Sequence, residues 1–427
     1  MTNRRLALAI VLAGCGRVGF QDVGSGSGGD GGGGGTGDTI TLVLASDASS
    51  SGPAGTPLAG ATVLIERAGG TDRIATDATG TAQFSAAGVV AWHVAIRQGQ
   101  GWRIYTMVGP PSGTIELGRR PDSGTNHTMT FVVPDNGSSS FWLHLPEACG
   151  FPPKEGSATF TLGYDPACEG KTTRVIAFTR PPNAAQDRYL DAGAVTLTSG
   201  ATRTVTGSYA ALPTYPIQVS NLPSLASSVG AGIYARTGLD LTLLGGDFAS
   251  ATPQGGAATV SATAAPGGNA LWISTQGNLP IQYSSSSDRI VPSMITAQTS
   301  FDARTMVPLF DSLVLTRPPT MAWTGGEGQG TILAVEITSG QVQWDAYLAP
   351  SATSVTFPAL PADLGAPVPQ SFDFASVARL DIPGATTADL VPTIDRAWPS
   401  WPNDPTLFPA AGAGMARIVY SIGLGPP

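Results

Sequence analysis

Few side chains in this sequence have the types and spacing that catalysis requires. The three histidines are His93, His127 and His144, and none forms an H-E-x-x-H pair of the kind that binds zinc. No G-x-S-x-G turn presents a serine nucleophile, and no glycine-rich phosphate loop follows a strand and opens a helix. We therefore expect no metal, no cofactor and no enzymatic activity.

Single carboxylates in the C-terminal half leave one enzymatic alternative open. Folding could bring two of them together as the acid and base of a glycoside hydrolase. The alternative function is therefore an exported, glycoside-directed hydrolase, and the acids considered are Asp363, Asp373, Asp381, Asp389 and Asp395.

A pair of tryptophans is the better indication of binding. Trp398 and Trp401 lie three residues apart in the proline-rich stretch RAWPSWPNDP. Polyproline II has three residues per turn, so both indoles would lie on one side and could stack on sugar rings or peptide prolines. Large aromatic side chains usually fill cores, so packing at the end of a sandwich is the favoured interpretation and ligand binding the alternative.

The alternation of apolar and polar residues around each histidine predicts the side of the strand on which it lies. In VVAWHVAIR and FWLHLP, His93 and His144 lie opposite the apolar residues of their strands, and His127 lies in a boundary loop. We expect all three at surface or edge positions.

The first 15 residues have the pattern of an export signal. Arg4 and Arg5 precede the apolar run 6–12, and the small residues Ala13 and Gly14 follow it. A membrane-spanning helix needs roughly 20 apolar residues, so this run is too short to remain in the bilayer as a helix.

The sequence Leu12-Ala13-Gly14-Cys15 resembles the lipobox of bacterial lipoproteins. The resemblance implies cleavage before Cys15 and a diacylglyceryl group on its thiol, which would anchor the protein in the membrane. Gly16 follows the cysteine where an aspartate would favour inner-membrane retention. We expect a lipid-anchored protein of the cell envelope, at the outer membrane. An ordinary signal peptide with a chance cysteine is the alternative.

Two further cysteines, Cys149 and Cys168, remain after Cys15 is assigned to lipid. Export would place them in an oxidising compartment, where an even number favours pairing. We predict a disulfide between them, with two buried free thiols as the alternative.

The composition is that of an extracellular β protein. Only 12% of residues are charged and the formal net charge is −8, while glycine and proline are abundant. Basic residues are scattered and form no patch, so nucleic acid is not an expected partner. The expected partners are the membrane, through the lipid anchor, and a glycan or protein ligand.

Composition and turn signals divide the chain into five segments and predict an all-β fold of tandem β-sandwich domains. In TDATGTAQF, Asp77 and Gly80 have the chemistry of a turn that pairs the flanking strands as a hairpin. The segments are a signal peptide (1–14), a Gly/Ser-rich tether (15–38), sandwiches at 39–118 and 124–212, and one or two further sandwich-like domains in 214–427.

Two stretches resemble known β domains. The stretches 57–63 and 76–84, PLAGATV and TDATGTAQF, resemble the carboxypeptidase regulatory-like domain, a transthyretin-type sandwich without catalytic residues. Residues 318–361 are weakly similar to a fibronectin type III half-sandwich. We interpret the chain as a cell-envelope lipoprotein that acts as a surface binding, adhesion or structural module.

Overall fold

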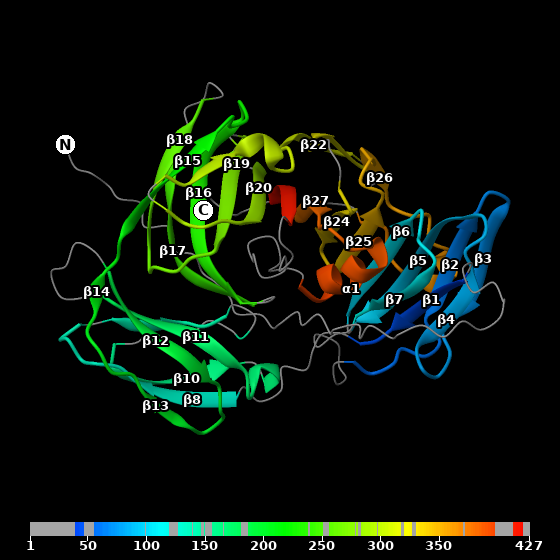
Figure 1. Cartoon of the computed structure of the whole chain (residues 1–427). Coiled ribbons are helices and arrows are strands. Elements are labelled where there is room, and N and C mark those ends of the chain that lie inside the picture. The colour runs from blue at the N-terminus through cyan, green and yellow to red at the C-terminus, as the bar shows by residue number, and fades with distance from the viewer. Residues whose placement is uncertain are drawn as a thin grey trace, which may run out of the picture.

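The computed structural model shows an almost entirely β protein (Figure 1). It describes residues 39–46, 55–98, 100–118, 127–138, 140–146, 149, 156–164, 166–180, 187–237, 240–250, 256–277, 279–280, 283–296, 298–316, 320–326, 330–369, 372–397 and 413–421. The helical segments in these ranges are α1 (Thr387–Ala397) and 3-10 turns at Pro166–Cys168, Ala303–Thr305 and Ala362–Leu364. The predicted all-β sandwich fold is confirmed. Within the described ranges, no helix has the length and apolar character to span a membrane.

The first region, residues 39–118, divides its strands between two sheets. β1, β4 and β7 form a three-stranded sheet, whereas β2, β3, β5 and β6 belong to a larger one. The bounds are β1 (Thr39–Leu44), β2 (Thr62–Arg67), β3 (Gly70–Ala75), β4 (Thr81–Ser85), β5 (Val89–Gln98), β6 (Gly101–Val108) and β7 (Gly113–Leu117).

The turn at residues 77–80 has the predicted chemistry but a different role. The Asp77 carboxylate accepts hydrogen bonds from the backbone N–H groups of Thr79 and Thr81, at 2.8 and 3.0 Å. Gly80 has a φ of 75°, and a Cβ there would lie 2.4 Å from the Leu44 carbonyl oxygen, so only glycine fits. The predicted hairpin is wrong, because β3 pairs with β2 and β4 pairs with β1.

The second region, residues 127–211, is a sandwich of two sheets, β10-β8-β13 and β14-β12-β11-β9. The outer side of the second sheet packs on the next region, where the Trp142 and Phe178 rings stack at 5.7 Å and Arg174 bonds the Pro266 carbonyl at 2.9 Å. The bounds are β8 (His127–Val132), β9 (Phe141–His144), β10 (Thr159–Tyr164), β11 (Thr172–Thr179), β12 (Arg188–Thr196), β13 (Thr202–Thr204) and β14 (Ala210–Ala211).

The remaining strands begin at residue 214 and fall into two successive groups. The first group is β15 (Thr214–Ser220), β16 (Ala226–Thr237), β17 (Asp240–Ser250), β18 (Ala258–Ala264), β19 (Ala270–Gly277), β20 (Tyr283–Pro292) and β21 (Ser300–Asp302). The second is β22 (Phe310–Thr316), β23 (Thr320–Gly325), β24 (Ile332–Ser339), β25 (Val342–Leu348), β26 (Ser354–Thr356), β27 (Phe374–Asp381) and β28 (Gly414–Ser421).

One sheet of 15 strands, here called the main sheet, connects the first region with both of these groups of strands. Its order is β21-β15-β18-β17-β16-β19-β20-β28-β27-β24-β25-β6-β5-β2-β3. β28 pairs with both β20 and β27, and β25 pairs in parallel with β6 of the first region. The first region is therefore joined to the end of the chain through backbone hydrogen bonds.

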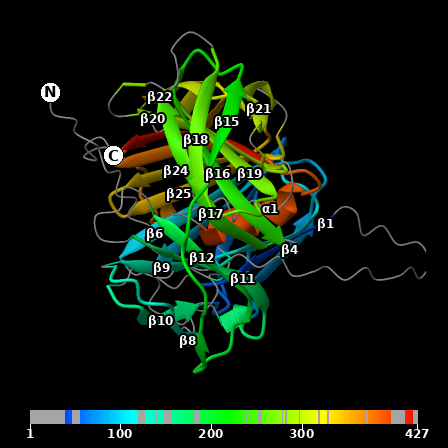
Figure 2. The same cartoon turned by 60° about the vertical axis from the view of Figure 1, so that its left-hand side comes forward.

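Different elements cover the two faces of the main sheet. On one face, called the central face, Leu390, Val391 and Ile394 of α1 share a core with the sheet β4-β1-β7. In both views α1 lies beside that small sheet (Figures 1 and 2). On the other face, the three-stranded sheet β22-β23-β26 packs over β24, β25, β27 and β28. These layers bury both faces of the strands that connect the regions.

The exposed strands pair through hydroxyl groups more than through charges. Thr130 and Thr161 contact each other across β8 and β10 at 3.2 Å. Ser312 and Thr324 do the same across β22 and β23 at 2.7 Å. Cross-strand pairs of this kind stabilise a sheet without ions, which accounts for the low charge content of the sequence.

Candidate functional site

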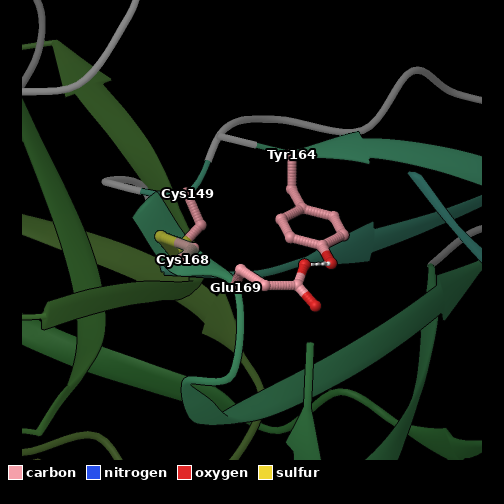
Figure 3. Close-up of a disulfide and its surroundings, with 4 residues drawn as sticks. All are labelled: Cys149, Tyr164, Cys168 and Glu169. Carbon is pink, nitrogen blue, oxygen red and sulfur yellow. Dashed lines mark hydrogen bonds between the residues drawn. A yellow bond between two sulfur atoms is a disulfide. The ribbon is translucent and has the colours of Figure 1, made fainter. Parts of the chain in front are cut away.

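The predicted disulfide between Cys149 and Cys168 is present, with the two Cα atoms 5.7 Å apart (Figure 3). Both cysteines are fully buried in the core of the second region. The Glu169 carboxylate beside the bridge accepts hydrogen bonds from the Tyr164 hydroxyl and, at 2.7 Å, from Nδ1 of His127. A buried bridge in such surroundings is a structural cross-link and not a reactive thiol site.

Three predicted site residues, Cys15, Trp398 and Trp401, lie outside the described residues. Acylation of Cys15 therefore stays a prediction. Both interpretations of the tryptophan pair, core packing and ligand stacking, also stay predictions.

The histidines form close contacts in the interior of the fold. His93 is 5% exposed, with Nδ1 3.0 Å from the Thr106 hydroxyl and Nε2 3.2 Å from the Glu66 carboxylate. Its predicted surface position is wrong, because both faces of β5 are covered. His144 is half-buried and donates from Nδ1 to the Leu243 carbonyl at 2.6 Å. Burial lowers the pKa of both imidazoles, that of His144 to about 4, so both are neutral at pH 7.

The five acids considered for hydrolysis each have a different local contact, and none of these contacts joins two of the five. Four bind a cation or a backbone N–H close by, and the fifth, Asp395, is buried among other polar groups. The partners are Arg73 for Asp363, Gly340 for Asp373, Arg289 for Asp381, Thr386 for Asp389 and Arg103 for Asp395.

An aromatic platform, formed by Phe248 and Trp272, lies on the central face of the main sheet. The two rings meet edge to face, with centroids 6.4 Å apart and planes at 83°. A Cβ on Gly230 would lie 2.3 to 3.0 Å from three atoms of the Phe248 ring, so the ring occupies the space over Gly230 that a side chain would fill. A Cβ on Gly232 would meet the Trp272 indole at 2.9 Å. Phe248 is 45% exposed, so part of its side chain is open to solvent.

Strand register places polar groups in line with this platform. Phe248 is opposite Gly230, which is opposite Ser274, which in turn is opposite Asp288. Paired residues share a face of the sheet, and neighbouring strands are about 4.8 Å apart. A ring, a gap over glycine, a hydroxyl and a carboxyl thus follow one another across four strands.

Asp288 is the acid at the end of this line. By register it lies directly opposite Ser274 on β19, and Trp272 lies two residues along β19 on the same face of the sheet. Desolvation raises the pKa of Asp288 to about 7, although Ser274, Trp272 and Arg417 favour the charged form. Asp288 therefore changes charge near neutral pH, on the same face as the platform.

Arg417 lies on the same face of the next strand, β28, two residues beyond Met415, which is the residue opposite Asp288. Its Nε donates to the Ser376 hydroxyl at 2.9 Å, and its guanidinium lies 6.0 Å from the Phe374 ring. Burial lowers the pKa of Arg417 to about 10, while Glu336 and Asp288 act in the opposite direction. The guanidinium is thus shared between two acids and remains charged at pH 7.

Further along the same face lies the Arg103 cluster, which consists of Arg103, Tyr105, Asp345 and Asp395. Arg103 donates to Asp345 at 2.8 Å and to Asp395 at 2.5 Å. Asp395 also accepts from the Tyr105 hydroxyl at 3.0 Å and from the Gly118 N–H at 2.5 Å. All four side chains are at most 4% exposed. The cluster joins α1 to β6, β7 and β25, and burial closes it to a ligand.

A pocket of about 300 Å³ opens elsewhere, at one end of the sheet β22-β23-β26. Its described lining contains no acid, and the Arg379 side chain in it is 2% exposed. The lining residues are Trp323, Thr324, Gly325, Pro350, Ser351, Thr353 and Arg379. The central face is the stronger candidate, because among the residues that the structure describes it combines an exposed ring with a carboxyl group that titrates near neutral pH.

Sequence reasoning did not find the platform. The signal was present as glycine at alternate positions, Gly230 and Gly232 in β16 and Gly246 two residues before Phe248 in β17. Glycine inside a strand often marks the close approach of another group. Glycines in two strands predict free space on one face of the sheet. Which side chain fills that space depends on how β17 pairs with β16, and the sequence alone does not show this pairing.

No family model and no curated protein matches this sequence. Among solved structures, the Bacillus anthracis TIE protein aligns over 62% of this chain and 50% of its own, with 10% identity and a TM-score of 0.15. A Ca²⁺-stabilised adhesin that helps an Antarctic bacterium bind ice aligns over 82% of this chain and 96% of its own, with 11% identity and a TM-score of 0.12. The aligned part thus spans about half the length of the TIE protein. Neither likeness carries an argument about fold or function.

Proposed function

We propose that this protein is a lipoprotein of the bacterial cell envelope that binds a glycan at the aromatic platform. The observation that carries the proposal is the Phe248 ring, which lies over Gly230 and is 45% exposed. The apolar C–H face of a sugar ring can stack on an exposed aromatic side chain. On the same face of the sheet, the partly exposed Asp288 offers a carboxyl group that can fix the orientation of a polar ligand.

A glycan panel that includes peptidoglycan fragments tests the ligand class. We expect the purified protein to retain one class of glycan and the Phe248→Ala variant to lose it. Val314→Ala is the matched control, because Val314 is 52% exposed on the opposite side of the fold, in β22. Equal retention by the wild-type protein and Phe248→Ala would refute a role for this ring.

The anchor is tested separately, at Cys15. If its thiol carries the lipid, the wild-type protein partitions into detergent and Cys15→Ser appears in the soluble fraction. A mature N-terminus beyond residue 15, without a lipid adduct in the mass spectrum, would contradict this part of the proposal.

Hydrolysis of a glycoside is the second candidate, and the titration of Asp288 is what favours it. Such an enzyme needs two carboxyl groups roughly 5 to 10 Å apart. The acid that shares Arg417 with Asp288, Glu336, lies three strands away in the order β20-β28-β27-β24, which is about 14 Å between backbones. Glu336 is also four residues along β24 from Ile332, the position in register with Asp288. This separation favours binding over hydrolysis. Release of reducing ends by the wild-type protein, but not by Asp288→Asn, would reverse the preference.

A further inference from the structure

Gln276 is an exposed side chain near the aromatic platform, and a contact with the neighbouring strand fixes its orientation. Register places Gln276 of β19 opposite Ser228 of β16, and the Ser228 hydroxyl donates to Oε1 of Gln276 at 3.1 Å. A glutamine amide has one acceptor oxygen and an NH₂ group with two donors. Because Oε1 faces Ser228, the Nε2 donors lie on the far side of the amide from β16.

Three groups that a ligand could contact surround Ser274 on the central face. Ser274 is opposite Asp288 on one side and, on the other, opposite Gly230, the glycine that the Phe248 ring covers. Gln276 lies two residues along β19, so it is a diagonal neighbour of both Gly230 and Asp288, at about 7 to 8 Å. Ser274 itself is only 5% exposed. A ring, an amide donor and a carboxyl acceptor thus surround one small, buried residue.

An acetamido group matches this arrangement of donor and acceptor. Its carbonyl oxygen accepts hydrogen bonds and its N–H donates one, on opposite sides of a planar group. The carbonyl oxygen can therefore accept from the Gln276 amide while the N–H donates to the Asp288 carboxylate. A carboxylate on the ligand would instead face Asp288 with like charge, and a free amine would face the Gln276 donors. Acidic sugars and unsubstituted amino sugars fit less well for these reasons.

We propose that Gln276 is a specificity-determining residue and that the glycan bound at the platform carries acetamido groups. The sugar ring stacks on Phe248, and its acetamido group bridges Gln276 and Asp288. Ser228 is a positioning residue, because it holds the amide with its donors directed away from β16. This inference rests on the proposed function, since it names the class of glycan for the same site.

Affinities for chitotetraose and cellotetraose test the inference, because the two sugars have the same linkage and differ in an acetamido group or a hydroxyl on each unit. Calorimetry at pH 8, where Asp288 is charged, should show the wild-type protein binding chitotetraose about tenfold more tightly. In Gln276→Glu the new carboxylate still accepts from Ser228 but has no donor. We expect this variant to lose the tenfold preference and to keep its affinity for cellotetraose. Gln83→Glu makes the same change at an exposed position on β4 and should keep the preference.

Ser228→Ala separates positioning from a purely structural role. We expect this variant to lose part of the preference with its affinity for cellotetraose unchanged, whereas an equal loss for both sugars would overturn the role given to Ser228. Equal affinity of the wild-type protein for the two sugars, or an undiminished preference in Gln276→Glu, overturns the inference. Absence of chitotetraose binding also overturns it. The glycan panel then decides the proposed function separately, because another glycan retained through Phe248 would leave that function standing.

Discussion

The two polar clusters on the central face are built from similar residues and differ in how completely they are enclosed. Arg103 lies between Asp345 and Asp395, and the oxygens of Asp395 are also bonded by Tyr105 and by the Gly118 N–H. At the other end, Asp288 and Arg417 are only partly covered, and an exposed ring lies three strands from the acid. The first cluster has no room for a ligand, whereas the second has an open side.

On one continuous sheet, the enclosed cluster contributes to stability and the open cluster is available for binding. A saturated, buried ion cluster holds elements in register, and removal of one member leaves a buried charge without compensation. A cluster beside an exposed ring contributes less to stability, and its groups remain available to a partner. The following variants test this division, from the largest expected effect to the smallest.

Arg103→Ala should have the largest effect on stability. The variant leaves Asp345 and Asp395 buried without their cation, which costs about 3 to 5 kcal/mol of unfolding free energy. Urea denaturation measures the loss. Arg73→Ala is the control, because its pair with Asp363 is exposed and should contribute less than about 1 kcal/mol. Equal losses in the two variants would show that the cluster does not hold the regions together.

Replacement of Cys149 and Cys168 by alanine should be next in size. The bridge closes a loop with a sequence separation of 19, so on the chain-entropy model its loss costs about 3 kcal/mol. The bridge lies in the second region, away from the platform, so affinity for the glycan should not change. A lower melting temperature with an unchanged Kd is the expected pair of results. A weaker Kd in this variant would mean that the binding surface extends to the second region.

Gly230→Ala tests whether the Phe248 ring must occupy the space over Gly230. The new methyl group would lie 2.3 Å from the ring, so the ring has to lift from the strand. Because the ring is exposed and can move, we expect less than about 1 kcal/mol of destabilisation but a Kd weakened about tenfold. Gly69→Ala adds a methyl group to open space and serves as the control. An unchanged Kd in Gly230→Ala would contradict the geometry of the platform.

The smallest effect concerns pH and the contact of His144 in β9 with the Leu243 carbonyl in β17. The pKa of His144 is lowered to about 4 by burial, so between pH 6.5 and 4 the unfolded chain binds a proton that the folded chain does not. Stability therefore falls as the pH falls through this window, and His144→Gln should remove about 1 kcal/mol of that dependence at pH 5.5. Chemical denaturation at pH 7 and pH 5.5 measures the difference. An identical pH dependence in the variant would contradict the lowered pKa.

Asp288 changes the pH dependence of stability in the opposite direction. His144→Gln is therefore best compared with its parent protein when both carry Asp288→Asn. The raised pKa means that the folded chain keeps a proton, between about pH 4 and 7, that the unfolded chain has released. Stability from this group therefore falls as the pH rises through the same window. Asp288→Asn alone should make the protein more stable relative to the wild type at pH 8 than at pH 4.

Local patterns in the sequence predicted some features of this structure and could not predict others. Cysteine number and export predicted the Cys149–Cys168 bridge, and turn chemistry predicted the conformation at Asp77 and Gly80. The sheet partners of the strands around that turn were not predictable, because pairing depends on residues far along the chain. The contact of Trp344 with Thr106, 238 residues apart, shows how distant the strand partners are.

The candidate site was harder to predict than the fold, for the same reason. Asp288 is an ordinary acid in the sequence SSSSDRIVP, and only its neighbours on β19 and β28 raise its pKa. From the sequence alone, Phe248 would be assigned to the core. Its position over Gly230 becomes evident only from the pairing of their strands. Trp398 and Trp401 could be proposed as a site from the sequence because their spacing is visible in one short stretch. A site assembled across four strands has no such local signature.

The most direct test of the account is a paired measurement on Phe248→Ala, of Kd for the glycan and of unfolding free energy. Because the ring is 45% exposed, we expect less than about 2 kcal/mol of lost stability, compared with about 3 to 5 kcal/mol for a buried phenylalanine. The loss of stacking should weaken binding by about 1 to 3 kcal/mol, a range measured for aromatic stacking on nucleic-acid bases. Lost binding with stability nearly retained is the predicted result. A large loss of stability with Kd unchanged would contradict the account and identify Phe248 as a core residue.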